Sequence, residues 1–222
     1  MAKLVWDQTG ERLYETGVDR GVLFVYDTDG DEYGTGVPWN GLTAVNETPS
    51  GAESNPQYAD NIKYLDLYSA EEFGATIEAF TYPAEFEECD GSAELTQGVT
   101  IGMQNRKMFG FSYRNFVGNY TEGTDHGYKL HLIYGAKASP SEKNRSTVND
   151  SPEAVTFSWE VTTTPINVTG FKPTSHLIID STKADPTKLA ELEKKLYGDG
   201  SAGRSTLPLP DEVKTIMTPA EE

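Results

Sequence analysis

An acidic run near the N-terminus is the first stretch whose residue types could bind a metal ion. It reads Asp27-Thr28-Asp29-Gly30-Asp31-Glu32, and carboxylate oxygens are ligands that calcium prefers. An EF-hand loop, however, needs glycine at its sixth position and a bidentate glutamate at its twelfth. Counted from Asp27, those positions hold Glu32 and Pro38. We therefore interpret the run as a solvated turn between two strands.

Histidine and cysteine are the other residue types here that could support metal or nucleophilic chemistry. His126, His131 and His176 are too scattered for a zinc motif. We expect His126 in a turn, and His131 on the polar face of a strand as a surface or pore residue. The single Cys89 lies between two acidic residues, whose charges would raise the pKa of its thiol, whereas a nucleophile needs a lowered pKa. The sequence therefore predicts no metal site and no reactive thiol.

No stretch of the sequence has the signature of an active site. The chain lacks a Gly-x-Ser-x-Gly elbow, a P-loop and a dinucleotide-binding glycine motif. Adjacent glutamates such as Glu71-Glu72 are common in acidic proteins and do not identify a glycosidase. We therefore expect a protein that is not an enzyme and that has no catalytic residues and no cofactor.

The charge balance limits the possible partners. Acidic residues outnumber basic ones 35 to 18, for a formal net charge of −17. Such a protein repels nucleic acid phosphates, which argues against DNA binding but not against DNA passing close by. A single cysteine forms no internal disulfide, the N-terminus lacks the apolar run of a secretory signal, and no segment approaches the ~18 apolar residues of a membrane span. We expect a protein made in a reducing cytoplasm, with no membrane partner.

Most of the chain has the pattern of β-strands separated by turn residues. Residues 21–26 form a continuous apolar run, as in a strand buried on both faces. Residues 108–117 and 128–134 both alternate with a period of two, which predicts an antiparallel hairpin with a loop over 118–127. Residues 75–82 show the same alternation. Further strands are expected at 41–48, 154–164 and 175–180.

One helix is predicted near the C-terminus. Asp185 suits the N-cap and Pro186 the first helical position. Leucines then recur at helical spacing from Leu189 to Leu196, and Gly198 ends the helix. Such a helix would pack its leucine stripe on the outside of a sheet.

The economical domain organisation is a single domain over residues 1–222. It divides into an N-terminal arm (1–20), a β-sandwich core (21–182), and a segment with the helix and a C-terminal arm (183–222). Two polar stretches, 46–60 and 136–152, are predicted to be interaction loops. The fold class is therefore mainly β, with one outer α-helix near the C-terminus.

Seven segments spread through the chain carry a family resemblance. They include Met1-Ala2-Lys3-Leu4-Val5-Trp6-Asp7-Gln8-Thr9-Gly10-Glu11-Arg12 and Pro38-Trp39-Asn40-Gly41-Leu42-Thr43-Ala44-Val45-Asn46-Glu47, followed by residues 58–64, 73–79, 125–130, 151–154 and 207–212. In their order and completeness they resemble the major tail tube proteins of long-tailed, siphovirus-type bacteriophages and of prophages of Gram-positive bacteria. The likeness covers essentially the whole chain, and none of the segments is a catalytic signature.

This resemblance implies an architecture and a set of partners. Subunits of the family form hexameric rings that stack into a tube, and each β-sandwich subunit contributes four strands to a continuous barrel around the lumen. The expected partners are other copies of the chain, the tape-measure protein, the tail terminator, and baseplate or tip proteins. Phage DNA would pass through the lumen without specific binding. The expected location is the virion tail, after assembly in the bacterial host cytoplasm.

The resemblance and the charge together suggest functional residues. Six copies of the subunit would place on the order of one hundred negative charges in each ring, and a like-charged wall would keep DNA from adhering. Glu47 and Glu78 are the candidate lumen-lining residues, with the outer surface as the alternative location for both. The candidate inter-ring contacts are Glu53, Tyr58, Asp125 and His126.

Two other classes of function remain open on the sequence. A tail terminator or a capsid-decoration protein could share the fold, because phage structural proteins reuse similar β folds. A carbohydrate-binding β-sandwich would account for the tyrosine and tryptophan content. A hydrolase ranks last, since no coherent acid–base or nucleophile set is present.

Overall fold

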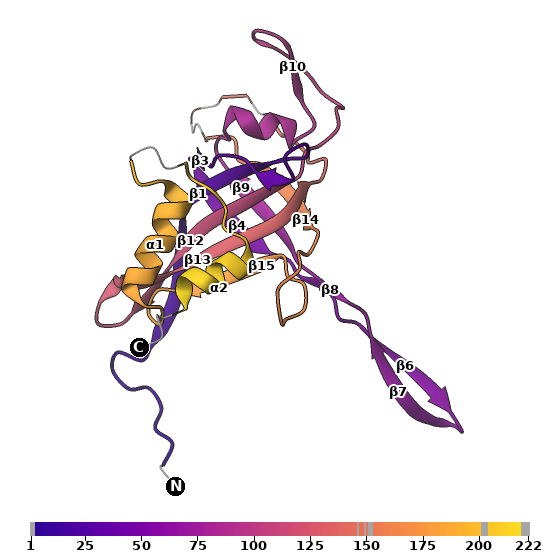
Figure 1. The fold of residues 1–222 in the computed structure, drawn as a ribbon, viewed down its shortest axis with the longest axis vertical. Coiled ribbons are helices and arrows are strands. Elements are labelled where there is room, and N and C mark those ends of the chain that lie inside the picture. Colours follow the sequence, from indigo (N-terminus) through magenta and orange to yellow (C-terminus); the bar gives the residue numbers. More distant parts are fainter. Residues whose placement is uncertain (1–2, 146, 149, 151–152, 201–203, 219–222) are drawn as a thin grey trace.

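The computed structural model describes residues 3–145, 147–148, 150, 153–200 and 204–218. Residues 1–2 of the predicted N-terminal arm and residues 146, 149 and 151–152 of the second predicted interaction loop lie outside the described residues. So do residues 201–203 and 219–222 of the predicted C-terminal arm. Strands dominate the described chain (Figure 1), which confirms the mainly β prediction. The elements in chain order are β1 (Leu13–Asp27), β2 (Glu32–Tyr33), β3 (Val37–Trp39), β4 (Leu42–Glu47), β5 (Ser50–Gly51), β6 (Ser54–Ala59), β7 (Ile62–Tyr68), β8 (Glu71–Glu72), β9 (Gly74–Ala79), the 3-10 helix η1 (Ala84–Glu88), β10 (Ala93–Thr96), β11 (Val99–Ile101), β12 (Phe109–Asn119), β13 (Gly123–Ala138), β14 (Phe157–Thr163), β15 (His176–Asp180), α1 (Pro186–Tyr197) and α2 (Pro210–Met217).

A nine-stranded sheet forms the body of the molecule. Its main path runs β2-β1-β12-β13-β14-β9-β4, with β3 added beside β1 and β15 beside β13. The named pairs are antiparallel throughout. The sheet bends so that β4, at one end of the path, lies close to β1. It therefore encloses an interior between its two ends.

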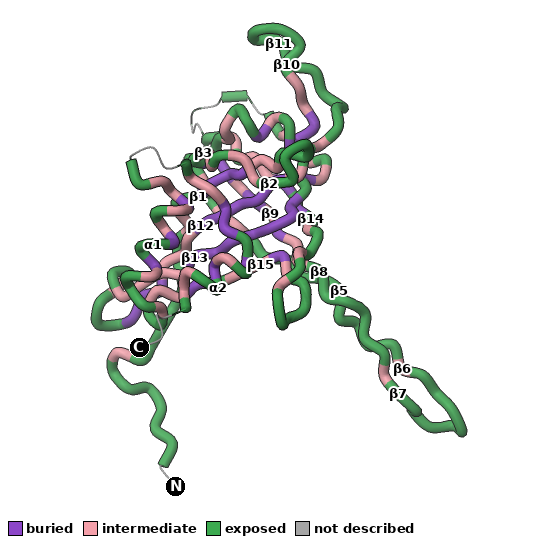
Figure 2. The backbone as a smooth tube through the Cα atoms, in the orientation of Figure 1, coloured by how far each residue is buried: buried purple, intermediate pink, exposed green. Residues whose placement is uncertain are grey.

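Apolar side chains pack on both faces of this bent sheet. Figure 2 shows that the buried residues lie mainly along its central strands. The interior holds a cluster of aromatic rings, in which Trp39, Phe86 and Trp159 contact one another edge to face or tilted. On the outer face, the leucines of α1 and Val213 of α2 cover residues of β1, β13 and β15. The strands of the middle of the sheet are therefore buried on both sides, and alternation there does not separate core from solvent.

The strand alternation predicted for residues 75–82 is confirmed over residues 75–79, but the strand β9 ends at Ala79 and so is shorter than predicted. Ala75, Ile77 and Ala79 are buried, whereas Thr76 and Glu78 face away from the interior and are only half-buried. The same two-sided pattern holds for the neighbouring strand β14.

The predicted hairpin of residues 108–117 and 128–134 is confirmed, but its loop is much shorter than predicted. Ladder pairing continues to Asn119 and Gly123, so only residues 120–122 form the turn. The side-chain Oδ1 of Asn119 accepts hydrogen bonds from the N–H groups of Thr121 and Glu122, at 3.0 and 2.6 Å, and closes the turn. Polar residues of this stretch therefore occupy strand positions, because local side-chain hydrogen bonds favour a tight turn.

Gly135 marks the point where β13 exchanges one partner strand for another. Residues up to Ile133 pair with β15, and residues from Ala136 pair with β14. Gly135 has a φ of +60°, and a Cβ atom there would lie 2.2 Å from the carbonyl oxygen of Thr164. Only glycine accepts both the left-handed backbone and this close approach.

The predicted outer helix is confirmed as α1. The Asp185 carboxylate accepts hydrogen bonds from the N–H groups of Thr187 and Lys188, at 2.8 and 3.0 Å, and so caps the helix. Its three predicted leucines are buried against the sheet.

The prediction of one helix followed by an extended C-terminal arm is wrong for the described part of that segment. A second helix, α2, begins at Pro210, and Leu207 and Val213 are buried on the outer face of the sheet. Lys195 of α1 forms an ion pair with Glu212 of α2. The apolar side chains of this proline-containing segment pack against the sheet, and their burial stabilises the segment in place of an extended arm.

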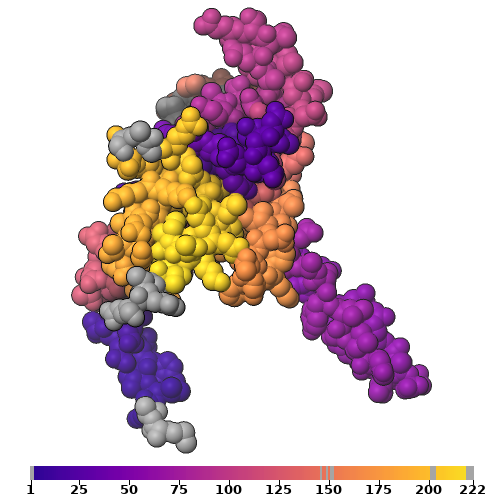
Figure 3. Space-filling model, in the orientation of Figure 1, coloured from indigo at the N-terminus to yellow at the C-terminus, as the bar shows by residue number. Residues whose placement is uncertain are grey.

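Three segments project from the body (Figure 3). One is the N-terminal arm, which is shorter than predicted because β1 begins at Leu13 and pairs with β12 from that residue on. The second is the short β10–β11 hairpin. The third is a long hairpin in which β5 pairs with β8 and β6 with β7, which we call the hairpin arm (residues 50–72). Among the described strands, β6 and β7 pair only with each other.

The hairpin arm corrects the prediction of a loop over residues 46–60. Asp60 and Asn61 have φ values of +51° and +63°, as a two-residue type I′ turn requires. Asparagine and aspartate tolerate that backbone better than other non-glycine residues. The first strand of the arm, β6, is mostly polar, so its sequence lacks the alternation of apolar and polar residues that predicts a strand. The sequence therefore did not predict the strand or the turn that follows it.

Candidate functional site

A cluster of polar side chains lies at one end of the sheet interior. Glu47 comes from the end of β4, Tyr113 from β12, His131 from β13 and His176 from the start of β15. His176 stands directly opposite Ile133, which is two residues along β13 from His131, so the two histidines share a face of the sheet. The bend that brings β4 toward β1 places Glu47 across the interior from the two histidines.

The functional atoms of this cluster lie within contact distance of one another. His131 Nδ1 is 3.0 Å from His176 Nε2 and 3.2 Å from Glu47 Oε1. His176 Nε2 is 3.8 Å from the same Glu47 oxygen. The Tyr113 hydroxyl donates a hydrogen bond of 2.7 Å to Glu47 Oε1, and the Tyr113 ring stacks on His131 with centroids 4.5 Å apart.

A second layer of hydrogen bonds fixes the tautomer of His131. The Asn115 amide Nδ2 donates to Glu15 Oε2 at 2.7 Å, so its Oδ1 is the atom that faces His131 Nε2 at 2.9 Å. An amide oxygen only accepts. His131 Nε2 therefore carries the proton, and in the neutral ring Nδ1 presents a lone pair to His176 and Glu47. Lys129 completes the chain by an ion pair with Glu15.

Burial keeps the two histidines neutral near pH 7. Burial, with His176 as the next cause, lowers the pKa of His131 to about 4. Burial also lowers the pKa of His176, against the opposing charge of Glu47. Neutral imidazole nitrogens are the form that binds metal ions, and Glu47, His131 and His176 are the described residues whose ligand atoms group in this way.

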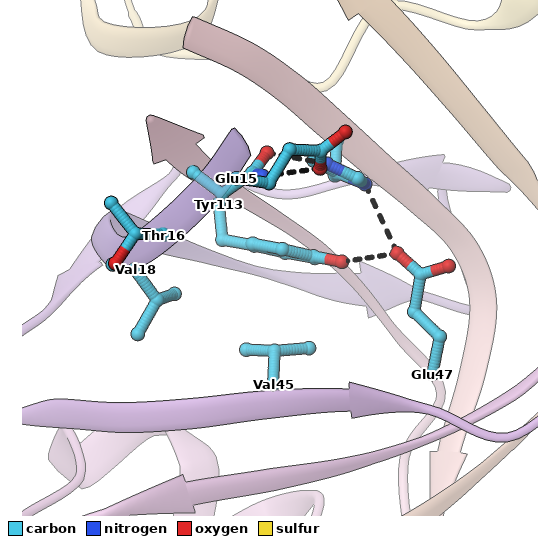
Figure 4. Close-up of a pocket in the computed structure, with 9 residues that line it drawn as sticks. Glu15, Thr16, Val18, Val45, Glu47 and Tyr113 are labelled. Carbon is cyan, nitrogen blue, oxygen red and sulfur yellow. Dashed lines mark hydrogen bonds and ion pairs between the residues drawn. The ribbon is translucent and has the colours of Figure 1, made fainter. Parts of the chain in front are cut away.

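The cluster opens onto a pocket of about 290 Å³. Figure 4 shows the Tyr113 ring and the Glu47 side chain pointing toward each other, with Glu15 close to Tyr113 and Val45 at the strand below; all four line the pocket. The expectation that His131 is a surface or pore residue is therefore wrong. Its side chain lies on the face of β13 that points to the interior of the sheet, and it is buried there.

Sequence reasoning missed this cluster and predicted no metal site. His131 and His176 are 45 residues apart, and no spacing motif joins them to Glu47. Only the strand register and the bend of the sheet bring the three together. A signal was present in His131, which stands in an otherwise apolar stretch of β13.

The two predicted lumen residues lie on opposite faces of the sheet. Glu47 pairs with Ala75, whose side chain is buried in the interior, whereas Glu78 pairs with Ala44 and Ser158 on the other face. Glu160 shares the outer face with Glu78, because it pairs with Thr76. Among the described residues, the apolar cluster beneath α1 and α2 includes no residue of β14, β9 or β4. The structure thus groups Glu78 with Glu160, and not with Glu47.

The four predicted inter-ring residues fall into two places. Glu53 and Tyr58 are exposed on the hairpin arm. Asp125 and His126 lie at the start of β13 and not in a loop, and His126 Nδ1 is 2.7 Å from Glu122 Oε2. Their contact role stays a prediction.

The remaining chemical candidates behave as expected from the sequence. Residues 28–31 form the turn between β1 and β2, and Asp27 pairs with Glu32 at its ends. Burial, with Glu88 as the next cause, raises the pKa of the Cys89 thiol to about 12, so the thiolate is not available at neutral pH. Among the described residues, no helix has the length and apolar character needed to cross a membrane.

Comparison with known proteins identifies no family. No family model matches the chain, and no curated protein matches it. Among solved structures, it is similar to a chain of the sheath-tube complex of an extracellular contractile injection system, PVC, in the extended state. The sequences are 12% identical, the match covers 72% of this chain and 88% of the other, and the TM-score is 0.31. A TM-score below 0.5 does not establish a shared fold.

Proposed function

We propose that this chain is a structural, non-enzymatic subunit of a phage tail tube, in which hexameric rings stack around a negatively charged lumen that conducts DNA. The observation that carries the proposal is the hairpin arm. Ile62, Tyr64 and Tyr68 alternate with Leu65 and Leu67 along β7, so apolar side chains stand on both of its faces. All five are exposed, Tyr64 by 68% and Leu67 by 55%.

A two-stranded hairpin with both faces apolar needs a partner. Isolated two-stranded hairpins are marginal in water, and apolar patches of this kind on a protein surface indicate interaction sites. We infer that other copies of the chain cover the arm. The N-terminal arm supports the same conclusion, because Leu4, Val5 and Trp6 are exposed on it, Trp6 by 75%. Whole-chain sequence resemblance to major tail tube proteins supports tubes as the product.

The outer face of β14, β9 and β4 is the surface that could line a lumen. It carries Glu78 and Glu160 together with uncharged polar residues. Closing this part of the sheet with strands of neighbouring subunits would remove exposed strand edges. The net charge of −17 fits a wall that DNA passes without adhering. On this proposal the tape-measure protein fills the lumen before DNA, and terminator and baseplate or tip proteins meet the tube ends.

Sedimentation velocity over a range of protein concentrations tests this function against its alternatives. For a tube subunit we expect the monomer to give way, as concentration rises, to a broad distribution of species larger than a hexamer. Growth that stops at a single ring would indicate a terminator-like protein. A monomer at every concentration, with a melting temperature that rises on addition of glycans, would contradict the proposal and favour a carbohydrate-binding module.

A further inference from the structure

We propose that Glu47, His131 and His176 form a binding site for one zinc ion, which links β4 to β13 and β15 at the base of the hairpin arm. The inference does not depend on the tail tube assignment. It rests on the geometry of three ligand atoms from three strands, on the hydrogen bonds that orient them, and on the open pocket beside them.

The distances among the three ligand atoms fit tetrahedral zinc coordination. Zinc binds imidazole nitrogen and carboxylate oxygen at about 2.0–2.2 Å, so neighbouring ligand atoms of a tetrahedral site are roughly 3.3 Å apart. The observed separations of 3.0, 3.2 and 3.8 Å bracket that value. A point about 2.1 Å from all three atoms, the usual zinc–ligand distance, therefore exists just outside their plane.

Two of the three ligands, His131 and Glu47, have the outer hydrogen bonds that metal ligands commonly have. His131 donates its Nε2 proton to Asn115 Oδ1, which leaves Nδ1 free to bind. The Tyr113 hydroxyl donates to Glu47 Oε1 and orients that carboxylate. Outer partners of this kind fix the ring tautomer and the ligand orientation. Two imidazoles and one carboxylate favour zinc or a similar borderline cation over calcium or magnesium, which prefer oxygen ligands.

The pocket beside the cluster supplies the fourth coordination position. It is lined by Tyr113, His131 and Glu47, so a water molecule from the pocket can complete the tetrahedron. The ion would connect β4, at one end of the strand path, to β13 in its middle, since β14 and β9 separate these two strands in the strand order. It would also fix Glu47, three residues before the hairpin arm begins at Ser50.

Zinc binding to the tag-free, EDTA-stripped full-length chain tests the proposal. We expect isothermal titration to give one zinc ion per chain, and the melting temperature to rise by about 5–10 °C at a hundredfold excess over Kd. Calcium and magnesium should have no such effect. Cobalt(II) should give the visible absorption bands of a tetrahedral complex.

Matched variants separate this site from other histidines. Glu47→Gln and His176→Gln should each weaken zinc binding by tenfold or more and remove the cobalt bands. His126→Gln, which removes a histidine outside the cluster, should bind zinc as the wild type does. Glu47 is exposed, so its variant is expected to remain folded, and circular dichroism checks this. Absence of zinc binding by the wild type would show that His131 and His176 form only a hydrogen-bonded pair, and would overturn the proposal. Unchanged binding in both cluster variants, or loss in His126→Gln, would overturn it as well.

Discussion

Replacing Tyr64 and Leu67 with serine is expected to abolish assembly while leaving the subunit folded. The two side chains lie on opposite faces of β7 and are both exposed in the isolated chain. Burying a large apolar side chain contributes about 1.5–3 kcal/mol, so the pair would contribute roughly 3–6 kcal/mol per hairpin arm. That range corresponds to about a 10²–10⁴-fold loss of affinity at every subunit contact. Sedimentation velocity at a concentration where the wild type polymerises measures the effect.

A control in the same arm distinguishes lost apolar contact from a disturbed hairpin. Asn55 and Gln57 lie on the paired strand β6, and their replacement by serine removes little apolar surface. This control should still assemble. Both double variants should have the same free energy of unfolding as the wild type to within about 0.5 kcal/mol, as surface substitutions usually do. Assembly of the Tyr64/Leu67 variant at wild-type concentrations would show that the arm is not the contact.

Gly135→Ala is expected to destabilise the chain by about 2–5 kcal/mol. The left-handed backbone costs a residue with a Cβ atom roughly 1–2 kcal/mol. Forcing an atom into an already packed position adds about 1–3 kcal/mol, since the new Cβ would lie 2.2 Å from the Thr164 carbonyl oxygen. Urea unfolding followed by circular dichroism measures the loss. Because Gly135 separates the β15 and β14 segments of β13, relaxation there would also move His176.

Gly98→Ala provides the matched control. Gly98 also has a positive φ, +77°, but a Cβ atom there meets nothing within 4 Å. Its replacement by alanine should lower the free energy of unfolding only by the cost of the left-handed backbone, about 1–2 kcal/mol. Equal losses in the two variants would mean that the close approach to Thr164 has no energetic importance.

Hydrophobic periodicity and helix-capping residues predicted the strands β12 and β13 and the helix α1 correctly. The period-two alternation of β12 and β13 and the capped leucine stripe of α1 led to the correct elements, because each signal lies within about a dozen residues. The helix α2 was missed because its eight residues lie in a proline-containing tail that reads as extended. Its Pro210 at the first helical turn was the available signal.

The hairpin arm and the positions of Glu47 and Glu78 could not be predicted from local sequence patterns, because they depend on strand pairing and register. The hairpin arm carries apolar residues on both faces, so it shows no core-and-solvent alternation, and its turn residues Asp60 and Asn61 are not the usual Asn-Gly pair. In the sequence, Glu47 and Glu78 both lie in predicted strands, at positions expected on the polar face of the strand. A register irregularity between Leu42 and Ala44 decides which face Glu47 occupies, and a shift of one residue reverses every side chain of a strand.

On the proposed function, we assign Glu78 and Glu160 to the lumen wall in place of Glu47. Glu47 is turned inward and engaged by Tyr113, whereas Glu78 and Glu160 share the uncovered outer face of β9 and β14. The central question is therefore whether copies of the chain join so that this face is turned toward a channel and the hairpin arms are covered.

A cryo-EM reconstruction of the purified, polymerised protein tests this claim most directly. We expect hollow tubes of stacked rings, with both faces of residues 62–68 packed against other subunits and with Glu78 and Glu160 on the lumen wall. Particles that remain single subunits at high concentration, or tubes in which the hairpin arm extends into solvent, would contradict the account.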